Sequence, residues 1–349
     1  MAWAPNGPAH ARPGLVQHPA MNGEFALTTK APPAATSGAR VSVVIPCYNG
    51  ARWIARAIES VLGQQHGNVE IIVIDDGSTD ATPDILRKFR NIQSRRTMNQ
   101  GGCCARNAGL RLATGDFVLF LDADDYLEPD SLEAWVADAE GVDIVFGPFA
   151  HERGRQRRMG RGSGPGANAI SVACQWLKGR YTPPCAVLWR VSFVRALGGW
   201  AENLLRNQDG EIAVRGLLNG ARVGFAARGC GIYVHHDHAG RVSKRSGGKV
   251  SASELSALDN LWRLAQSRGQ GLMREDFAGA FYRLAYHSFA TGVDDIGELA
   301  LSRARELGLT GHIGSLRHRM LSRALGLRNK LVMTAMVKGR GVTYDATVS

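Results

Sequence analysis

Residues 41–50 read VSVVIPCYNG, and residues 69–76 read VEIIVIDD. Each stretch begins with a run of β-branched residues, which favour strands. Between them, apolar residues recur at intervals of three and four over residues 51–62, as on one face of an amphipathic helix. The order strand, helix, strand predicts a βαβ unit whose two strands run parallel.

The same alternation continues downstream. The pattern predicts helices from Thr82, over 104–113 and over 129–139, and strands over 117–121 and 143–146. Strands that alternate with helices indicate a mostly parallel sheet covered on both faces. We therefore predict an α/β protein of the Rossmann-like type.

Acidic residues directly follow two of these predicted strands, at Asp75, Asp76, Asp122, Asp124 and Asp125. The carboxyl ends of parallel strands meet at one edge of a sheet, where doubly wound folds bind their ligands. Like charges gathered there favour a hard divalent cation, Mg²⁺ or Mn²⁺, which often shares its coordination shell with substrate phosphates. The pattern predicts a metal and diphosphate site. Asp, Gly and Ser also form ordinary turns and helix caps, so either cluster alone fits both interpretations.

The chain has 349 residues and a formal net charge of +11. Its length predicts one large domain with appendages, or two domains. The excess positive charge indicates an anionic partner, and the alternatives are a nucleic acid, a membrane surface and a phosphorylated ligand. Aromatic residues do not alternate with the basic clusters as a platform for single-stranded nucleic acid requires, so we expect no nucleic-acid partner.

Other features of the sequence bear on location. Six cysteines without a CxxC pair or a zinc-like spacing indicate reduced thiols in a cytosolic protein. No apolar run reaches the roughly 18 residues that suggest a membrane span. The first residues, MAWAPNGPAHARPGL, lack the apolar core of a signal peptide. We expect a cytoplasmic protein, either free or bound peripherally to the inner face of the plasma membrane.

Four motifs carry a family resemblance: VSVVIPCYNG (41–50), VIDDGSTD (73–80), NQGGCCARNAG (99–109) and GDFVLFLDADD (115–125). In this order and spacing they resemble the nucleotide-sugar half of the family 2 glycosyltransferases, which have the GT-A fold. The resemblance implies an inverting, metal-dependent enzyme that moves a sugar from a nucleotide-diphosphate donor, most simply a UDP-sugar, to a hydroxyl acceptor. The family typically builds bacterial polysaccharides or glycoconjugates, so a glycan or lipid-linked acceptor is implied as well.

The resemblance assigns donor-side residues. Pro46 and Tyr48 would border the nucleobase, and either Asp75 or Asp76 would accept a hydrogen bond from the edge of a uracil-like base. The resemblance also places Arg106, Asn107 and Asp122 in the nucleotide pocket, the last of them on the ribose.

The same comparison assigns the metal site. Asp124 of the DxD motif would coordinate the Mn²⁺ or Mg²⁺ that bridges the diphosphate, with Asp125 as support. Residues 235–243, HHDHAGRVS, are similar to a family segment that closes over the diphosphate, and there we favour His238 as a metal or phosphate contact. An ordinary surface loop is the alternative for these histidines.

The acceptor side matches more loosely. LGGWAEN at residues 197–203 and NQDGEIAVR at residues 207–215 resemble the family's acceptor half. The resemblance implies that Asp209 is the base that takes the acceptor's proton, with Glu211 as the fallback. Gln208 stands where the family usually has Glu. An exposed helix start, in which the helix dipole favours an acid, is the alternative interpretation.

The domain organisation predicted from these features is a disordered Pro/Ala/Gly-rich tail over 1–39, a GT-A domain over 40–246 and a basic helical region over 247–349. Within the GT-A domain, 40–146 is the nucleotide-sugar half and 147–246 the acceptor half.

Two segments carry much of the positive charge. The arginine-rich stretch over 151–168 is expected to be an irregular arm. In the basic helical region over 247–349, helices are expected over 254–266, 276–291 and 296–307. Nine Lys and Arg in the last fifty residues suggest docking on an anionic membrane, and a solvated helical face is the alternative.

Two rival functions remain on the same sheet. A sugar-nucleotide nucleotidyltransferase needs a Gly-rich basic loop after the first strand, where this chain has PCYNG at residues 46–50. A non-catalytic protein that binds nucleotides or other anions would keep the fold and use the charge alone. No GxxxxGK[ST] or GxGxxG loop supports a kinase-like or dinucleotide-binding protein.

Overall fold

The structure is a computed structural model that describes residues 38–236, 245–313, 315–330 and Met333. The chain divides into two compact units, Met1–Ala34 and Ala35–Ser349, and every described residue belongs to the second. Nearly all of the predicted tail over 1–39 lies outside the described residues, and so does His238.

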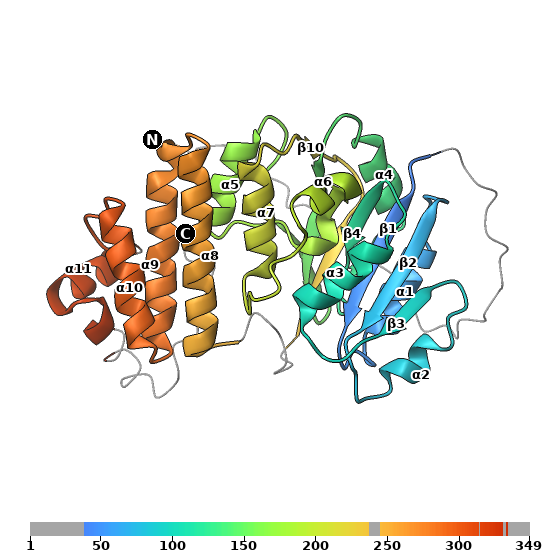
Figure 1. Ribbon diagram of the computed structural model, residues 1–349, viewed down its shortest axis with the longest axis horizontal. Coiled ribbons are helices and arrows are strands. Elements are labelled where there is room, and N and C mark those ends of the chain that lie inside the picture. The colour runs from blue at the N-terminus through green and yellow to red at the C-terminus, as the bar shows by residue number, and fades with distance from the viewer. Residues whose placement is uncertain (1–37, 237–244, 314, 331–332, 334–349) are drawn as a thin grey trace, which may run out of the picture. The chain divides into compact units, whose positions relative to one another are not determined.

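Among the described residues, the larger sheet (Figure 1) consists of β1 (Val41–Cys47), β2 (Val69–Asp75), β3 (Gln93–Arg96), β4 (Phe117–Phe120), β6 (Ile144–Phe146), β9 (Val187–Arg190) and β10 (Val223–Phe225). The order across it is β10-β6-β9-β4-β1-β2-β3. All of these strands run parallel except β9, which is antiparallel to β4 and to β6. The mostly parallel α/β sheet predicted from the sequence is confirmed.

The smaller sheet contains β5 (Tyr126–Leu127), β7 (Phe149–Arg153), β8 (Gln156–Met159) and β11 (Gly231–His235), in the order β5-β11-β7-β8. It corrects the prediction of a mobile loop or irregular arm for residues 151–159, where β7 and β8 form a hairpin, whereas residues 160–168 contain no helix or strand. Gly154 begins the two-residue loop with a φ of +58°, as primed hairpin turns require. The strands escaped prediction because charged residues occupy both faces and hide the period-two pattern.

Helices cover both faces of the larger sheet, because successive residues of a strand point to opposite sides. On one face, Val43 and Ile45 pack with α1 (Ile54–Leu62), α2 (Thr82–Leu86) and α4 (Ser131–Ala137). On the other, Val44 belongs to a core with α3 (Gly102–Leu112), α5 (Ala169–Leu177), α6 (Val191–Ala196) and α7 (Gln208–Leu218).

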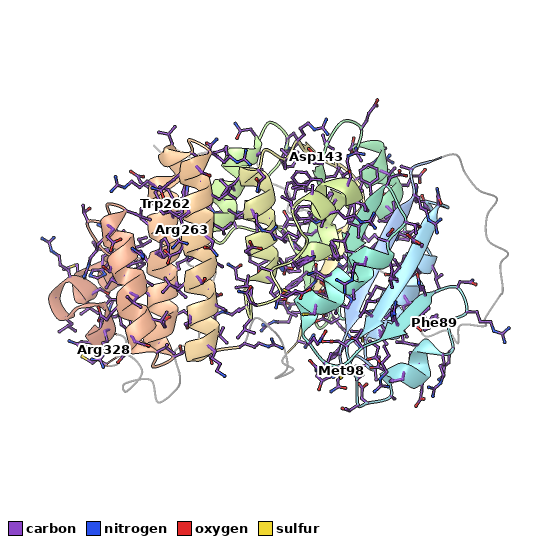
Figure 2. All side chains as sticks on the ribbon, viewed as in Figure 1. Phe89, Met98, Asp143, Trp262, Arg263 and Arg328 are labelled. Atoms are coloured by element: carbon purple, nitrogen blue, oxygen red, sulfur yellow. The ribbon has the colours of Figure 1, made fainter. Side chains whose placement is uncertain are left out.

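The C-terminal helices belong to that second core. They are α8 (Gly248–Ser267), the 3₁₀ turn η3 (Gly271–Met273), α9 (Arg274–Ala290), α10 (Asp294–Glu306) and α11 (Leu316–Leu325). Helix α8 packs on α7, and α9 packs on α5. The rings of Trp262 on α8 and Phe277 on α9 lie 5.2 Å apart between centroids. Figure 2 shows Trp262 on α8, among the C-terminal helices. None of the helices in the described ranges is both long and apolar enough to cross a bilayer.

This topology brings the two acidic clusters to one edge. Strands β2 and β4 flank β1 and run parallel to it, so Asp75 and Asp122 follow the same ends of their strands. Two strand spacings separate them, or about 10 Å. The larger sheet thus places the two predicted ligand groups beside each other across β1.

Candidate active site

The two aspartates that follow β2 differ in their hydrogen bonding. Asp76 accepts backbone N–H groups from residues 100–101 at 2.9 and 2.7 Å, one on each carboxylate oxygen. Asp75 accepts the Ser78 N–H on Oδ1 at 2.8 Å. Its buried Oδ2 has no hydrogen-bond partner among the described residues, although Arg96 lies 3.8 Å away as an ion-pair partner. Of the two, Asp75 has an acceptor oxygen left for a ligand.

Tyr48 stands at the same edge, immediately after β1. Its side chain is 51% exposed, which is unusual for a large aromatic residue. The backbone N–H of Asp76 donates to the Cys47 carbonyl at 2.8 Å, which fixes the loop beside Tyr48. Pro46 pairs with Ile74 in the register of β1 and β2. An aromatic face next to an available carboxylate oxygen suits a planar base.

A buried arginine joins this edge to α7. Nη2 of Arg106 donates to Asp122 Oδ1 at 2.5 Å, and Nη1 donates to Gln208 Oε1 at 3.1 Å. The guanidinium carbon also lies 4.6 Å from the centroid of the Trp200 ring. Arg106 therefore connects the end of β4 with the start of α7, although the two are distant in sequence.

Asp209 is the second residue of α7, in the first helical turn. Its buried Oδ1 atom has no hydrogen-bond partner among the described residues. The pKa of Asp209 is raised to about 6, mainly because the side chain is buried; Arg106 lowers the pKa and the neighbouring Asp122 raises it. A carboxylate with such a pKa is still ionised at neutral pH and is a stronger base than an exposed aspartate.

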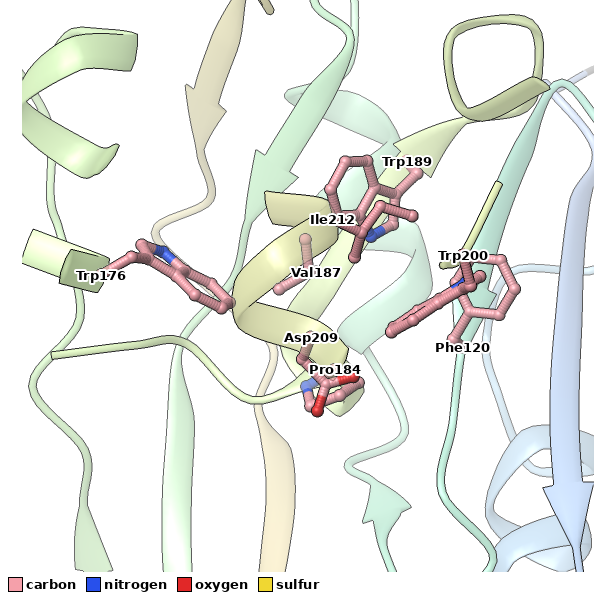
Figure 3. Close-up of a pocket in the computed structure, with 8 residues that line it drawn as sticks. All are labelled: Phe120, Trp176, Pro184, Val187, Trp189, Trp200, Asp209 and Ile212. Carbon is pink, nitrogen blue, oxygen red and sulfur yellow. The ribbon is translucent and has the colours of Figure 1, made fainter. Parts of the chain in front are cut away.

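Asp209 lines a pocket whose other walls are apolar and largely aromatic (Figure 3): Phe120, Trp176, Pro184, Val187, Trp189, Trp200 and Ile212. Pro184 belongs to the 3₁₀ turn η1 (Pro184–Ala186), which leads into β9. The indole Nε1–H of Trp200 is buried without a hydrogen-bond acceptor among the described residues. The pocket thus offers one buried acceptor and one buried donor on apolar walls, as ligand sites commonly do.

Two residues assigned from the resemblance, Asn107 and Glu211, also make structural contacts. Both carboxylate oxygens of Glu211 accept hydrogen bonds from the Arg215 guanidinium, one turn along α7, at 2.7 and 3.0 Å. Asn107 accepts the Trp200 N–H at 2.8 Å and donates to the Trp200 carbonyl at 3.0 Å. These contacts fix the turn over 197–202, so Asn107 positions Trp200 in the pocket wall.

The DxD segment forms a carboxylate cluster. Asp122, Asp124 and Asp125 each place an oxygen within 4.8 Å of the others. Asp125 is fully buried and accepts the Val234 N–H at 2.9 Å, which ties it to β11. Carboxylate oxygens of this kind are the ligands that Mg²⁺ and Mn²⁺ favour, so the residues present fit such an ion.

His236 lies beside this cluster. Its Nε2 atom is 2.6 Å from Asp124 Oδ2, and its ring stacks on Trp53 with centroids 4.5 Å apart. The sequence favoured His238 in the same segment, and that residue lies outside the described residues. The available signal was the position of His236 directly after β11, which pairs with β5 next to Asp125.

Comparison with known proteins agrees with these features. Residues 42–197 match the family model described as "Glycosyl transferase family 2". The putative glycosyltransferase EpsH of Bacillus subtilis is 37% identical over 117 residues, which are 32% of this chain and 34% of that protein. The succinoglycan biosynthesis protein ExoO of Rhizobium meliloti is 42% identical over 121 residues, or 33% and 34% of the two chains. The chain spans 17 to 34% of the length of several curated relatives.

Solved structures show the same fold. The crystal structure of Staphylococcus aureus TarS residues 1–349 has a TM-score of 0.61 at 19% identity, over 88% of this chain and 94% of that one. The same protein in complex with UDP-GlcNAc gives a TM-score of 0.58 at 18% identity, with the same coverage. This likeness confirms the GT-A type fold and the helical C-terminal region. Residues 42–197 thus form a domain that matches glycosyl transferase family 2.

Proposed function

We propose that the protein is an inverting, metal-dependent glycosyltransferase that moves a sugar from a UDP-sugar to a hydroxyl group of a glycan or lipid-linked acceptor. One observation carries the proposal. Asp209, with its pKa raised to about 6, lines an aromatic pocket and is linked through Arg106 to the DxD segment. The candidate base, an aromatic pocket and the diphosphate-binding acids therefore lie together.

The donor would occupy the carboxyl edge of the sheet. Oδ2 of Asp75 is the acceptor that a uracil N–H requires, and Tyr48 offers its face to the base. The complex of TarS with UDP-GlcNAc supports a uridine nucleotide on this fold. Asp122 would contact the ribose, and Arg106 would hold the Asp122 carboxylate in place.

The residue that would hold the metal is Asp124, with Asp125 fixing the loop between it and β11. A divalent cation there supplies charge neutralisation for the departing UDP. The imidazole of His236 orients Asp124 through their hydrogen bond, as partners behind metal ligands commonly do. His238 stays a prediction.

On the acceptor side, Asp209 accepts the proton of the attacking hydroxyl. The oxygen forms its bond to the anomeric carbon as the bond from that carbon to the UDP oxygen breaks, and the configuration inverts. The apolar walls around Asp209 exclude water and keep its carboxylate basic. Trp176, Trp189 and Trp200 are buried and form part of these apolar walls.

The cellular setting is proposed from relatives and charge. The name of ExoO, a succinoglycan biosynthesis protein, supports a role in polysaccharide synthesis. Helix α11 exposes Leu316 and Met320 on one face, flanked by Arg317, Arg319 and Arg323, and this arrangement suits an anionic membrane surface. A peripheral enzyme placed there would meet lipid-linked acceptors.

Two alternatives are less well supported. A nucleotidyltransferase has no use for a raised-pKa carboxylate in an aromatic pocket, and the loop between β1 and α1 contains one basic residue, Arg52, and one glycine, Gly50. Burying Asp209 costs stability, because its Oδ1 atom has no hydrogen-bond partner among the described residues. A non-catalytic binding protein would gain nothing from that cost.

The test is turnover with a panel of nucleotide sugars in the presence of Mn²⁺, scored as hydrolysis and as transfer. We expect a UDP-sugar to be the preferred donor, and both Asp124→Ala and Asp209→Ala to lose turnover. Asp84→Ala removes an acid whose side chain is 65% exposed and pairs only with Arg87 among the described residues, so it is the matched control. Wild-type turnover in both site variants would refute the proposal.

A further inference from the structure

The hairpin of β7 and β8 is strongly basic. We call residues 153–161 the arginine hairpin: the end of β7, the Gly154 turn, β8 and the two residues after it. It contains Arg153, Arg155, Arg157, Arg158 and Arg161 and no acidic residue. All five arginines are exposed. So many like charges on one short segment repel one another unless an anion joins them.

Only one of these charges is neutralised within the part of the chain that the structure describes. Arg157 lies 2.8 Å from Glu128 and 3.5 Å from Glu152, and it also donates to the Tyr126 hydroxyl. The other four arginines have no carboxylate within 4.0 Å in the described ranges. The hairpin therefore presents an unpaired surplus of four positive charges.

The strand register places the tip of the hairpin beside the proposed metal site. Strands β7 and β11 are parallel, and Arg153 pairs with His235. His236 directly follows β11, and its Nε2 atom contacts Asp124. Residues 153–155 accordingly lie at the same end of the smaller sheet as the DxD segment.

The far end of the arginine hairpin returns toward the pocket. A Cβ on Gly160 would lie 1.9 Å from the Phe149 ring, and one on Gly162 would lie 2.9 Å from Thr182 Oγ1. Gly162, one residue beyond the arginine hairpin, thus lies against Thr182, two residues before Pro184, which lines the Asp209 pocket. The basic segment runs from the metal side of the site to the acceptor side.

We propose that the arginine hairpin binds the anionic groups, phosphate or carboxylate, of a negatively charged acceptor chain whose reactive hydroxyl enters the Asp209 pocket. This rests on the proposed glycosyltransferase function and adds the chemical class of the acceptor. Guanidinium groups bind such oxyanions through paired N–H donors, which favours arginine over lysine at a site of this kind. The hairpin contains five arginines and no lysine.

Charges on an edge strand also prevent it from pairing with another chain. That role is met by either sign of charge and by lysine as well as arginine, and it needs no proximity to the catalytic edge. The uniform sign, the residue type and the position of the hairpin therefore favour a ligand over edge protection alone.

The test measures binding of a fluorescently labelled inorganic polyphosphate by anisotropy in the absence of donor. The variant is Arg153→Gln, Arg155→Gln and Arg158→Gln together. The matched control removes three exposed charges elsewhere, Lys88→Gln, Arg90→Gln and Arg263→Gln. We expect the hairpin variant to bind about tenfold more weakly and with a shallower salt dependence, because it makes fewer ionic contacts, and the control to bind like the wild type.

Equal binding by the hairpin variant and the wild type, or an equal loss in the control, would overturn the proposal. A second experiment measures the binding of the same variants to vesicles of phosphatidylglycerol. If the hairpin variant lost vesicle binding and kept polyphosphate binding, the hairpin would be a membrane contact and the proposal would be wrong. Circular dichroism melting of both variants identifies any loss that comes from unfolding. Hydrolysis of UDP-sugars by the wild type tests the glycosyltransferase function separately, so failure of either proposal is distinguishable.

Discussion

The Nη2 atom of Arg106 lies 2.5 Å from Oδ1 of Asp122, and the arginine side chain is only 7% exposed. The same guanidinium opposes the rise in the pKa of Asp209 that burial causes. One buried cation thus serves two acids, one on the donor edge of the sheet and one on the helix that carries the proposed base.

Removing this cation should destabilise the fold. Arg106→Met leaves Asp122 without its partner in a partly buried site, and losing one member of such a pair costs about 3 to 5 kcal/mol. Chemical unfolding followed by fluorescence measures the loss. Arg157→Gln removes a side chain that is 42% exposed and screened by solvent, and it should cost about 1 kcal/mol or less. Equal stability of Arg106→Met and the wild type would show that the pair is not a structural link.

Asp209→Asn should abolish the base without removing the pocket. We expect transfer to fall by about 10² to 10⁴, because general base catalysis contributes roughly that factor, and UDP binding to stay unchanged. Glu211→Gln is the comparison, since Glu211 is paired with Arg215 and is expected to affect stability more than turnover. A larger loss of transfer in Glu211→Gln than in Asp209→Asn would reverse the assignment.

The pH profile of transfer should have an acidic limb set by Asp209. The carboxylate must be ionised to accept a proton, and burial raises its pKa to about 6. Activity is therefore expected to be low at pH 5, to rise through about pH 6 and to level off above it. The profile is measured as kcat against pH, with donor and acceptor saturating. An activity that is flat from pH 5 to pH 7 would show that another group limits the reaction.

Mn²⁺-dependent binding of UDP should require Asp124 and the imidazole of His236 that contacts it. Asp124→Asn is expected to lose Mn²⁺-dependent binding of UDP, measured by calorimetry. His236→Ala should weaken it by about 10- to 100-fold, as loss of a group that orients a metal ligand does. Asp84→Asn, on the surface of α2, is the control. UDP binding that is indifferent to Mn²⁺ in the wild type would exclude the proposed metal site.

Membrane association should depend on the exposed apolar face of α11. Leu316→Ser with Met320→Ser removes two side chains that are 68% and 64% exposed, and co-sedimentation with anionic vesicles should fall. Leu272→Ser changes an equally apolar side chain on η3 that is 98% exposed, and it should have no effect. An absence of anionic-lipid dependence in the wild type would end this proposal.

The helices and strands that could be predicted from the sequence are those in which apolar residues form one clear pattern. Strands β1, β2 and β4 are buried and rich in β-branched or large apolar residues, and α1 has an unbroken apolar face. Strand β9 was missed because its four residues, VLWR, are too short to separate from the helix that follows directly. Its antiparallel direction is a property of the whole sheet rather than of those residues.

For the candidate site as well, the sequence predicts local features and not long-range contacts. The positions of Asp75, Asp122 and Asp124 at strand ends are local features that sequence reveals. The choice between Asp75 and Asp76 depends on which carboxylate the loop over 100–101 occupies, and the choice of His236 depends on pairing between β11 and distant strands. Those contacts are made across long stretches of chain and have no local signature.

The match to the family model ends at residue 197, but the apolar core does not. Val44 of the sheet and Phe281 of α9 belong to one continuous cluster, and Arg206 before α7 is paired with Glu254 on α8. A chimaera that exchanged the C-terminal helices between two relatives at residue 246 would join surfaces that were never fitted to each other. A crossover before α5 would keep α5 and α7 with those helices, but it would also exchange β9, which lies between β4 and β6, so these helices can be exchanged only together with part of the sheet.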